Sequence, residues 1–517
     1  MNCMTAQYVD ETKFRGLVRQ RSRILYSYTS FLANHEDPYR VLTRPLAGII
    51  LSQSIQLEEL VDFYGAQNNR RWARFRSFVA TLKRFSDVLY ELIHIKYSIP
   101  EYRIEEESQQ FEQNTDDAIS YIKNIVHNAA NQFVEHCIRL EIDSKPIEIL
   151  EDEIDEHILE GKLKYDHERR HVVEVGKIVT FLGTSFLNMI ADTSLKAIVE
   201  GDKPFDNESY SISPISEEKL RMLEHNFHNM QCNYDTYVSK TDTESHDESL
   251  PVLRGHVSVV FHLLTIAVSL SHYYERHLSE YRDPTQEFKG QLVDPSGLLE
   301  KLSDYCIHYI RNYVNSAKNL CQNMIKKYSE QGEITVPVPR YRGFHVRPST
   351  LIALIANHYG SDLKMDMLGE EYDARSPLEL FRANEAINSE KRKGLNREVL
   401  NLDINRKVDS NTDMRIIVND LVMTLADQGK MMIYDHPLEI SPDINERKEA
   451  TLIDTIRDEV ARLLAVGKVD IVTDLQAHFR GDKRVLEDIK LLAHYGYGED
   501  NHGNNIPLPP SLEYLRK

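Results

Sequence analysis

Apolar residues recur at three- and four-residue spacing through most of the first 330 positions, a period that places them on one face of a helix. The runs that show it lie at residues 12–33, 39–64, 72–99, 115–142, 146–162, 172–200, 217–237, 252–281 and 297–328. Polar, acidic residues at 202–216 and 239–249 predict irregular segments between helices. The pattern therefore predicts a mostly α-helical, multidomain protein whose residues 1–330 form one helical bundle, or two divided near residue 145.

The hydrophobic period changes after residue 332. Apolar residues at 334, 336 and 338 alternate with polar or proline residues, which predicts a strand, and Pro337 and Pro339 restrict it to a sheet edge. The pattern then predicts a helix at 351–359, strands at 363–367 and 371–374, a helix from 376, a strand at 400–404 and a helix at 413–428. After residue 435 the helical period returns, at 446–466, 471–479 and 483–494. We therefore expect an α+β domain at 333–435 and a helical C-terminal region at 436–517.

The octapeptide Gly-Phe-His-Val-Arg-Pro-Ser-Thr, residues 343–350, is the leading candidate site. His345 lies just before a predicted helix, where free backbone N–H groups and the helix dipole favour an anion. Pro348 suits the first turn of a helix, and Gly343 allows a backbone conformation that a Cβ resists. Arg347 can offer a planar guanidinium to a phosphoryl group. These residues indicate a histidine that carries a phosphate or lies beside one.

This octapeptide resembles the active-site motif of HPr, the histidine phosphocarrier family of the bacterial sugar phosphotransferase system, usually Gly-Leu/Ile-His-Ala-Arg-Pro-Ala. The chain keeps four of the motif positions: Gly343, His345, Arg347 and Pro348. It departs from the motif at three positions: Phe344, Val346 and Ser349. The order strand, helix, strand, strand, helix, strand, helix in the predicted domain is also the order of the HPr fold.

The resemblance implies an open-faced antiparallel sheet covered by three helices on one face, with the first strand at an edge. It implies that His345 is the phosphoacceptor and that Arg347 stabilises the transferring phosphoryl group. In the family, the histidine takes the group from enzyme I, which phosphoenolpyruvate charges, and passes it to a sugar-specific enzyme II. No cofactor of its own is expected, and the protein would be a phosphoryl carrier rather than an enzyme in the usual sense.

Ser376 lies where the family's regulatory serine lies when positions are counted from His345. Two interpretations stay open: a site of regulatory phosphorylation, or an N-cap that satisfies backbone donors of the helix that follows. Glu379, three residues later, would complete a capping box with Ser376.

Composition restricts the other classes of function. The net charge of −19 argues against a general nucleic-acid binder, and the 5 cysteines have no paired spacing, which is typical of reduced thiols in the cytoplasm. The most apolar run, residues 257–270, is shorter than a membrane span, which needs about 20 residues, so a buried helix is expected.

Two further stretches resemble functional motifs. Residues 167–171 match His-Glu-x-x-His, a pattern that can bind zinc, but two arginines separate the histidines, so a solvated helix face is favoured over a zinc site. The basic, aromatic residues 70–84 favour core aromatics surrounded by arginine stems over a nucleic-acid site.

The sequence thus predicts a cytoplasmic phosphocarrier or phosphorelay protein in a regulatory branch of the phosphotransferase system, with an enzyme I-like donor and an unidentified protein acceptor. The alternative is a non-catalytic scaffold that uses a degenerate HPr-like fold as an interaction module.

Overall fold

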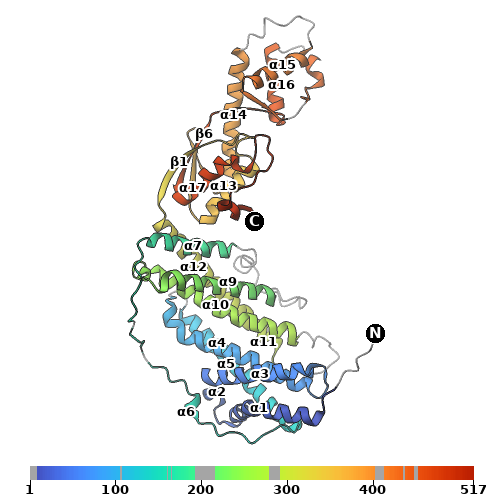
Figure 1. Cartoon of the computed structure of the whole chain (residues 1–517), viewed down its shortest axis with the longest axis vertical. Helices are drawn as coiled ribbons and strands as arrows, with labels where there is room; N and C mark the ends of the chain where they lie inside the picture. Colours follow the sequence, from blue (N-terminus) through green and yellow to red (C-terminus); the bar gives the residue numbers. More distant parts are fainter. Residues whose placement is uncertain are drawn as a thin grey trace. The chain divides into compact units, whose positions relative to one another are not determined.

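The computed structural model describes residues 8–104, 108–159, 161–164, 166–191, 216–278, 292–401, 413–434, 437–446 and 452–516. The chain divides into two compact units, residues 1–324 and 325–517 (Figure 1). Helices hold 70% of the residues and strands 7%, which confirms the prediction of a mostly α-helical, multidomain protein.

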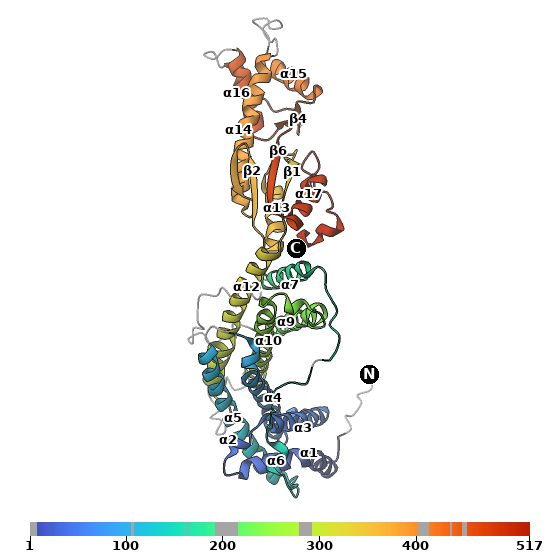
Figure 2. The ribbon, with the colours of Figure 1, turned by 90° about the vertical axis from the view of Figure 1, so that its left-hand side faces the viewer.

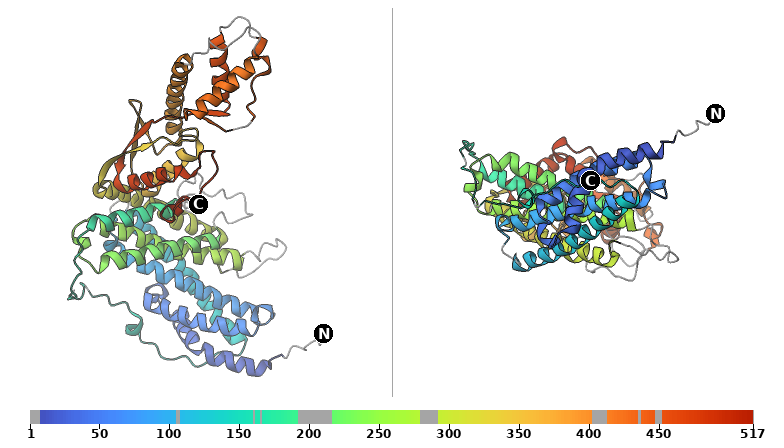
Figure 3. Two further views of the ribbon diagram at one scale, coloured as in Figure 1. Left: turned by 45° about the horizontal axis from the view of Figure 1, so that its top comes forward. Right: turned by 90° about the horizontal axis from the view of Figure 1, so that it is seen from below.

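Long helices that pack side by side build the first unit. Helix α4 contacts α3, α5 and α10, and α10 in turn contacts α9 (Figures 1 and 3). The helices are α1 (Glu11–Asn34), α2 (Pro38–Val41), α3 (Arg44–Phe63), α4 (Ala73–Tyr102), α5 (Ser108–Arg139), α6 (Glu151–Ile154), α7 (Val175–Ile190), α9 (Glu217–Tyr234), α10 (Ser249–Tyr273), α11 (Pro295–Glu300) and α12 (His308–Tyr328). Their apolar faces form the core, as the three- and four-residue spacing predicted.

The helix predicted at residues 146–162 is wrong. Apart from the single turn α6, the described part of this stretch is not helical. It is held along the first helices by its backbone and acidic side chains: Ser27 Oγ accepts the N–H of Ile147 at 3.0 Å, and Glu156 accepts the N–H of Arg44 at 3.2 Å. Several of its apolar side chains, such as Ile158 and Leu159, are exposed, so a helix here would have little core to cover.

One described helical stretch, Ser249–Leu278, is long and apolar enough to cross a membrane. However, 67% of its most apolar window is buried inside the unit, where α10 packs against α4 and α9. The packing of a core helix accounts for its apolar character, as the sequence predicted for residues 257–270.

A histidine pair joins α4 to α10. Nε2 of His94 lies 3.1 Å from Nε2 of His262, whose Nδ1 lies 2.7 Å from a carboxylate oxygen of Glu91. Burial, together with the nearby His262, lowers the pKa of His94 to about 4. The unfolded chain therefore binds more protons than the folded one between about pH 6.5 and pH 4, so this unit should lose stability as pH falls through that range.

His94→Gln should reduce this acid sensitivity, because an amide stays neutral while it keeps a hydrogen-bonding group beside His262. We expect the midpoint of acid unfolding to move to lower pH. The fluorescence of Trp72, the single tryptophan of the chain, would measure this midpoint. His225→Gln, at an exposed position of α9, is the matched control and should leave the midpoint unchanged. An equal response of the two variants would contradict the assignment to His94.

The second unit is built on a four-stranded antiparallel sheet in the order β1-β6-β2-β3. Its strands are β1 (Gln331–Pro337), β2 (Leu363–Met367), β3 (Glu370–Asp373) and β6 (Gln476–Asp482). Strand β1 lies at an edge, which is the position that Pro337 requires. The helices that follow the strands are α13 (Val346–Tyr359), α14 (Pro377–Asn401) and α17 (Lys483–His494).

These three helices and one face of the sheet share a single hydrophobic core. The strands supply Met365 and Phe479, and the helices supply Ile352, Ile387 and Ile489, all fully buried. The other face carries charged side chains: Arg480 donates to Asp366 at 2.9 Å and to Glu371 at 2.7 Å across neighbouring strands. The sheet is therefore covered on one face and polar on the other.

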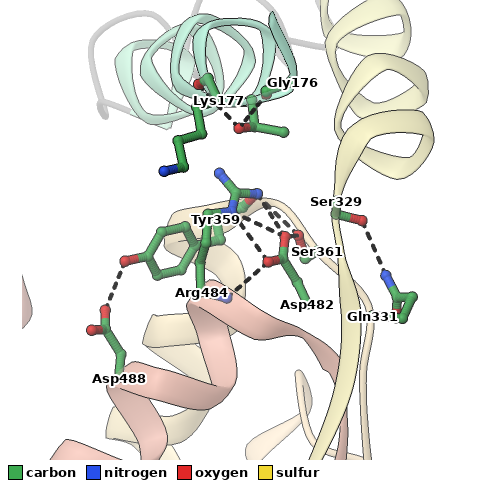
Figure 4. Close-up of polar contacts among 10 residues, drawn as sticks. Gly176, Lys177, Ser329, Gln331, Tyr359, Ser361, Asp482, Arg484 and Asp488 are labelled. Atoms are coloured by element: carbon green, nitrogen blue, oxygen red, sulfur yellow. Dashed lines mark hydrogen bonds and ion pairs between the residues drawn. The ribbon is translucent and has the colours of Figure 1, made fainter. Parts of the chain in front are cut away.

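A capped helix start joins β6 to α17. Asp482 is buried and accepts hydrogen bonds from the backbone N–H of Arg484 at 2.9 Å and from Ser361 Oγ at 2.9 Å (Figure 4). The Arg484 guanidinium also donates to it, at 2.6 Å. In the same view, Tyr359 donates to Asp488 at 2.8 Å, which ties α13 to α17 (Figure 4). These bonds fix the last strand and helix against the helix that follows the candidate motif.

Two predictions for this region are corrected. The fourth strand was expected at 400–404, but α14 continues to Asn401 and residues 402–404 lie outside the described residues. The fourth strand of the sheet is instead β6, at a place where a helix was predicted for residues 471–479. Residues 436–517 are consequently not a separate helical region, because β6 and α17 complete the sheet and core that begin at β1.

A small lobe is inserted between α14 and β6. It contains α15 (Met414–Asp427), β4 (Met431–Ile433), α16 (Leu452–Ala465) and β5 (Val469–Ile471), and β4 pairs antiparallel with β5. The lobe has its own apolar core, to which Leu395 near the end of α14 contributes. Figure 2 shows α14 running from the sheet into this lobe, so that one helix supports both cores.

Candidate functional site

The loop between β1 and α13 holds the candidate histidine at a helix start. His345 is the N-cap residue of α13, with extended backbone angles, and its carbonyl accepts the N–H of Ser349 at 3.2 Å. Gly343 has a φ of 63°, and a Cβ there would lie 2.2 Å from Oδ1 of Asn384. Glycine is therefore required both for the left-handed backbone and for the close approach of α14.

The inserted lobe and α14 support the same loop. Arg342 has a φ of 52°, which is uncommon for a residue with a side chain. Its backbone N–H donates to Asp470 at 3.2 Å, its guanidinium donates to the carbonyl of Gly467 at 2.8 Å, and its carbonyl accepts from Asn384 at 3.1 Å. Asp470 also forms a buried ion pair with Lys391 of α14 at 2.8 Å. These contacts hold the backbone directly before the histidine.

The His345 imidazole lies between two acceptors. Nδ1 lies 3.1 Å from the carbonyl oxygen of Gly343. Nε2 lies 3.3 Å from Oε1 of Glu499, in hydrogen-bonding geometry, and 3.1 Å from Oε2. The ring of Tyr341 packs edge-on at a centroid distance of 5.3 Å. The Glu499 side chain is only 7% exposed, against 23% for His345, so the carboxylate faces the histidine rather than solvent.

Arg347 lies near the same carboxylate. Its Nε is 3.9 Å from Oε1 of Glu499, and among the described residues this Nε has no hydrogen-bond acceptor. A Cβ on Gly498 would lie 3.3 Å from Arg347 Nε, so the small residue lets the chain pass close to the guanidinium. The structure thus brings together three of the predicted site residues, Gly343, His345 and Arg347. Pro348 is buried in the first turn of α13.

Arg347→Ala should lower the stability of the second unit, because Glu499 would keep only His345 as a positively polarised neighbour. Removing a cation beside a buried carboxylate leaves that charge less compensated, which should cost about 1 kcal/mol or more. We expect a lower free energy of unfolding, measured by hydrogen exchange of the amides in α13. Arg382→Ala, which breaks an exposed ion pair with Glu379, is the control and should leave stability nearly unchanged. Equal losses in the two variants would contradict this account.

Glu499 was not predicted as a site residue. It belongs to a turn after α17, in a stretch that reads in the sequence as a Gly- and Asn-rich tail. Asp500 closes the turn by accepting the N–H groups of His502 and Asn504 at 2.8 and 2.9 Å. The fully buried Tyr497 anchors it through a hydrogen bond to the carbonyl of Pro337 at 2.7 Å. No local sequence signal connects this carboxylate to a histidine 154 positions earlier.

Ser376 occupies the N-cap position of α14, and its carbonyl accepts the N–H groups of Glu379 and Leu380. The predicted capping box is corrected: the backbone N–H of Ser376 donates to the carbonyl of Asp373, and the Glu379 carboxylate accepts from Arg382. These bonds are all local, so none of them joins Ser376 to His345.

The structure also places the two other motifs that the sequence analysis considered. Residues 167–171 are not helical, and His171 lies 2.6 Å from Asp242 rather than on one helix face with His167. No group of three or more metal-ligating side chains is found among the described residues. Trp72 and Phe75 are buried, which confirms the prediction of core aromatics, and Arg76 pairs with Asp62 at 2.8 Å.

No family model matches the chain, and no curated protein or solved structure matches it.

Proposed function

We propose that the protein is a phosphoryl carrier that accepts a phosphoryl group on His345 and passes it to a protein acceptor. The observation that carries this proposal is the position of His345 as N-cap of α13, with Arg347 two residues later and close to the same Glu499 carboxylate. Free N–H groups in the first turn of a helix and a guanidinium both stabilise the oxygens of a transferring phosphoryl group.

The order of elements supports the same proposal. With the inserted lobe set aside, the second unit runs β1, α13, β2, β3, α14, β6, α17, which is the strand and helix order of the HPr fold. The sheet is antiparallel, has β1 at an edge and shares one core with three helices on one face. The motif histidine therefore lies at the same point in the order of elements as in that family, between the first strand and the first helix.

The phosphoryl group would pass directly from an imidazole of the donor protein to the imidazole of His345. A nitrogen lone pair of His345 attacks phosphorus of a phosphohistidine on the donor protein, and a new P–N bond forms. The P–N bond of the donor breaks, and its electron pair leaves on the donor imidazole. Phosphoenolpyruvate enters only as the source that charges the donor, an enzyme I-like protein. Because the large helical unit could report the phosphorylation state through contacts with other proteins, we favour a regulatory role in the cytoplasm.

The experiment is to incubate the full-length protein with enzyme I and phosphoenolpyruvate labelled in its phosphate. We expect label that is lost in acid and retained in alkali, as for a phosphoramidate, and a labelled peptide that contains residues 343–350. No label on the wild-type protein would overturn the proposal and favour the alternative, in which the same fold is only a docking module.

A further inference from the structure

The turn at residues 498–506 lies against the ring of His345. Its two ends are fixed, because Tyr497 and Leu508 are buried in the core of the sheet. Between these anchors, Glu499 is the one buried side chain of residues 499–505, and most of the polar residues that follow it are exposed: Asn501, His502, Asn504 and Asn505. Glu499 therefore supplies most of what holds the 498–506 turn against the site.

A second contact joins the tip of this turn to the same site. Gly503 has a φ of 82°, and a Cβ there would lie 2.5 Å from the ring of Tyr341. The Tyr341 ring in turn packs edge-on against His345 at a centroid distance of 5.3 Å. The 498–506 turn thus contacts the site at its base, through Glu499, and at its tip, through Gly503.

This closed arrangement of the turn is incompatible with a phosphoryl group on His345. Nε2 lies 3.1 Å from Oε2 of Glu499, and Nδ1 lies 3.1 Å from the carbonyl oxygen of Gly343, so acceptor oxygens face both ring nitrogens. A phosphoryl group on either nitrogen brings about two negative charges to within the width of one imidazole ring from the carboxylate. Because the Glu499 side chain is shielded from solvent, the repulsion between these charges is stronger than it would be in water.

We propose that the 498–506 turn is a latch that is closed on the unmodified His345 and released when His345 carries a phosphoryl group. This inference rests on the proposed function and names its regulated element. In the closed form, His345 and Arg347 compensate the buried Glu499 carboxylate. A phosphoryl group has more charge and more acceptor oxygens, so it attracts the Arg347 guanidinium and the free N–H groups of α13 more strongly. The carboxylate is then buried beside an anion without a cation, and moving it into solvent removes that cost.

Release of the turn would let another protein distinguish the two states of His345. The released turn uncovers the face of the Tyr341 ring against which Gly503 lies. The coupling is also reciprocal: the closed turn disfavours phosphorylation by the same factor by which phosphorylation disfavours closure. Removing the charge of Glu499 should therefore make phosphorylation of His345 more favourable.

The closed form can be tested on the full-length chain without a phosphoryl donor. Diethyl pyrocarbonate reacts with a free imidazole nitrogen, so His345 should react slowly in the wild-type protein, as measured by mass spectrometry of its peptide. Gly503→Ala should make it react several times faster, because the added Cβ pushes the turn away from Tyr341. Gly369→Ala is the matched control: Gly369 has a φ of 87° but no atom within 4 Å of an added Cβ, so similar backbone strain is introduced away from the site. Equal rates in the three proteins would overturn the latch.

The labelling reaction tests the release. Glu499→Gln should shift the phosphoryl equilibrium with enzyme I toward His345 by about 5–150-fold, the usual range of coupling between two sites. Glu513→Gln, at an exposed position of the same tail, removes an equal charge and should leave that equilibrium unchanged. In the wild-type protein, labelling should speed hydrogen exchange of the amides in residues 498–506.

The outcomes separate the latch from the carrier function. Labelled protein whose turn exchanges as before, or a Glu499→Gln equilibrium equal to that of the wild type, would overturn the latch and leave the carrier function intact. Absence of label would overturn the proposed function and the latch with it.

Discussion

His345→Gln is expected to abolish acid-labile labelling by enzyme I and phosphoenolpyruvate. The label requires a nitrogen lone pair that can attack phosphorus, and an amide nitrogen has none available because it is delocalised into the carbonyl. Glutamine is a better replacement than alanine, because its NH₂ group can still donate a hydrogen bond to the buried carboxylate of Glu499. Loss of label can then be separated from loss of fold, which is followed by circular dichroism.

The control for this experiment is another histidine of the same unit. His478 lies in β6 on the polar face of the sheet, where its Nδ1 is 3.1 Å from the hydroxyl of Thr335. His478→Gln should keep the full label, because no helix start or arginine of the candidate motif faces it. Label that persists in His345→Gln would place the phosphoacceptor elsewhere and remove the motif from the mechanism.

Lys391→Met is expected to cause the largest loss of stability, about 3–5 kcal/mol, because it leaves the Asp470 carboxylate buried without its cation. The Lys391 side chain is 2% exposed and that of Asp470 is 6% exposed, so solvent cannot replace the ammonium group. Asp470 also accepts the N–H of Arg342, so the loss should loosen the loop before His345 as well. Hydrogen exchange in β5 and α14 would measure the first effect, and exchange of the Arg342 amide, which donates to Asp470, would measure the second.

A paired variant tests the physical reason for that loss. Lys391→Met combined with Asp470→Asn removes both charges, and we expect it to recover part of the stability, because a neutral amide is less costly to bury than a lone carboxylate. Trp72 lies in the first unit, so its fluorescence during unfolding serves as an internal control that should not change. Equal destabilisation of the single and double variants would contradict the ion-pair explanation.

Much of the second unit could be predicted from local pattern. Alternating residues identified β1, β2 and β3, and the octapeptide identified a histidine before a helix. These signals are local, since they depend on the pleat of a strand, the period of a helix and the few residues around a cap. The same local reasoning failed at residues 471–479, where apolar spacing indicated a helix but the chain forms the fourth strand.

Tertiary structure decided the rest. Strand β6 exists because β1 and β2 offer it hydrogen-bonding partners on both sides, and that pairing overrides a short apolar pattern that is ambiguous between strand and helix. Glu499 reaches His345 for a similar reason: Tyr497 and the last turn of the chain are buried in the core, which fixes the carboxylate against the imidazole. By itself the sequence determined the motif, the helical first unit and three of the four strands. Which strand completes the sheet, and which carboxylate faces the histidine, depends on contacts between residues more than a hundred positions apart, and such contacts leave no trace in local spacing.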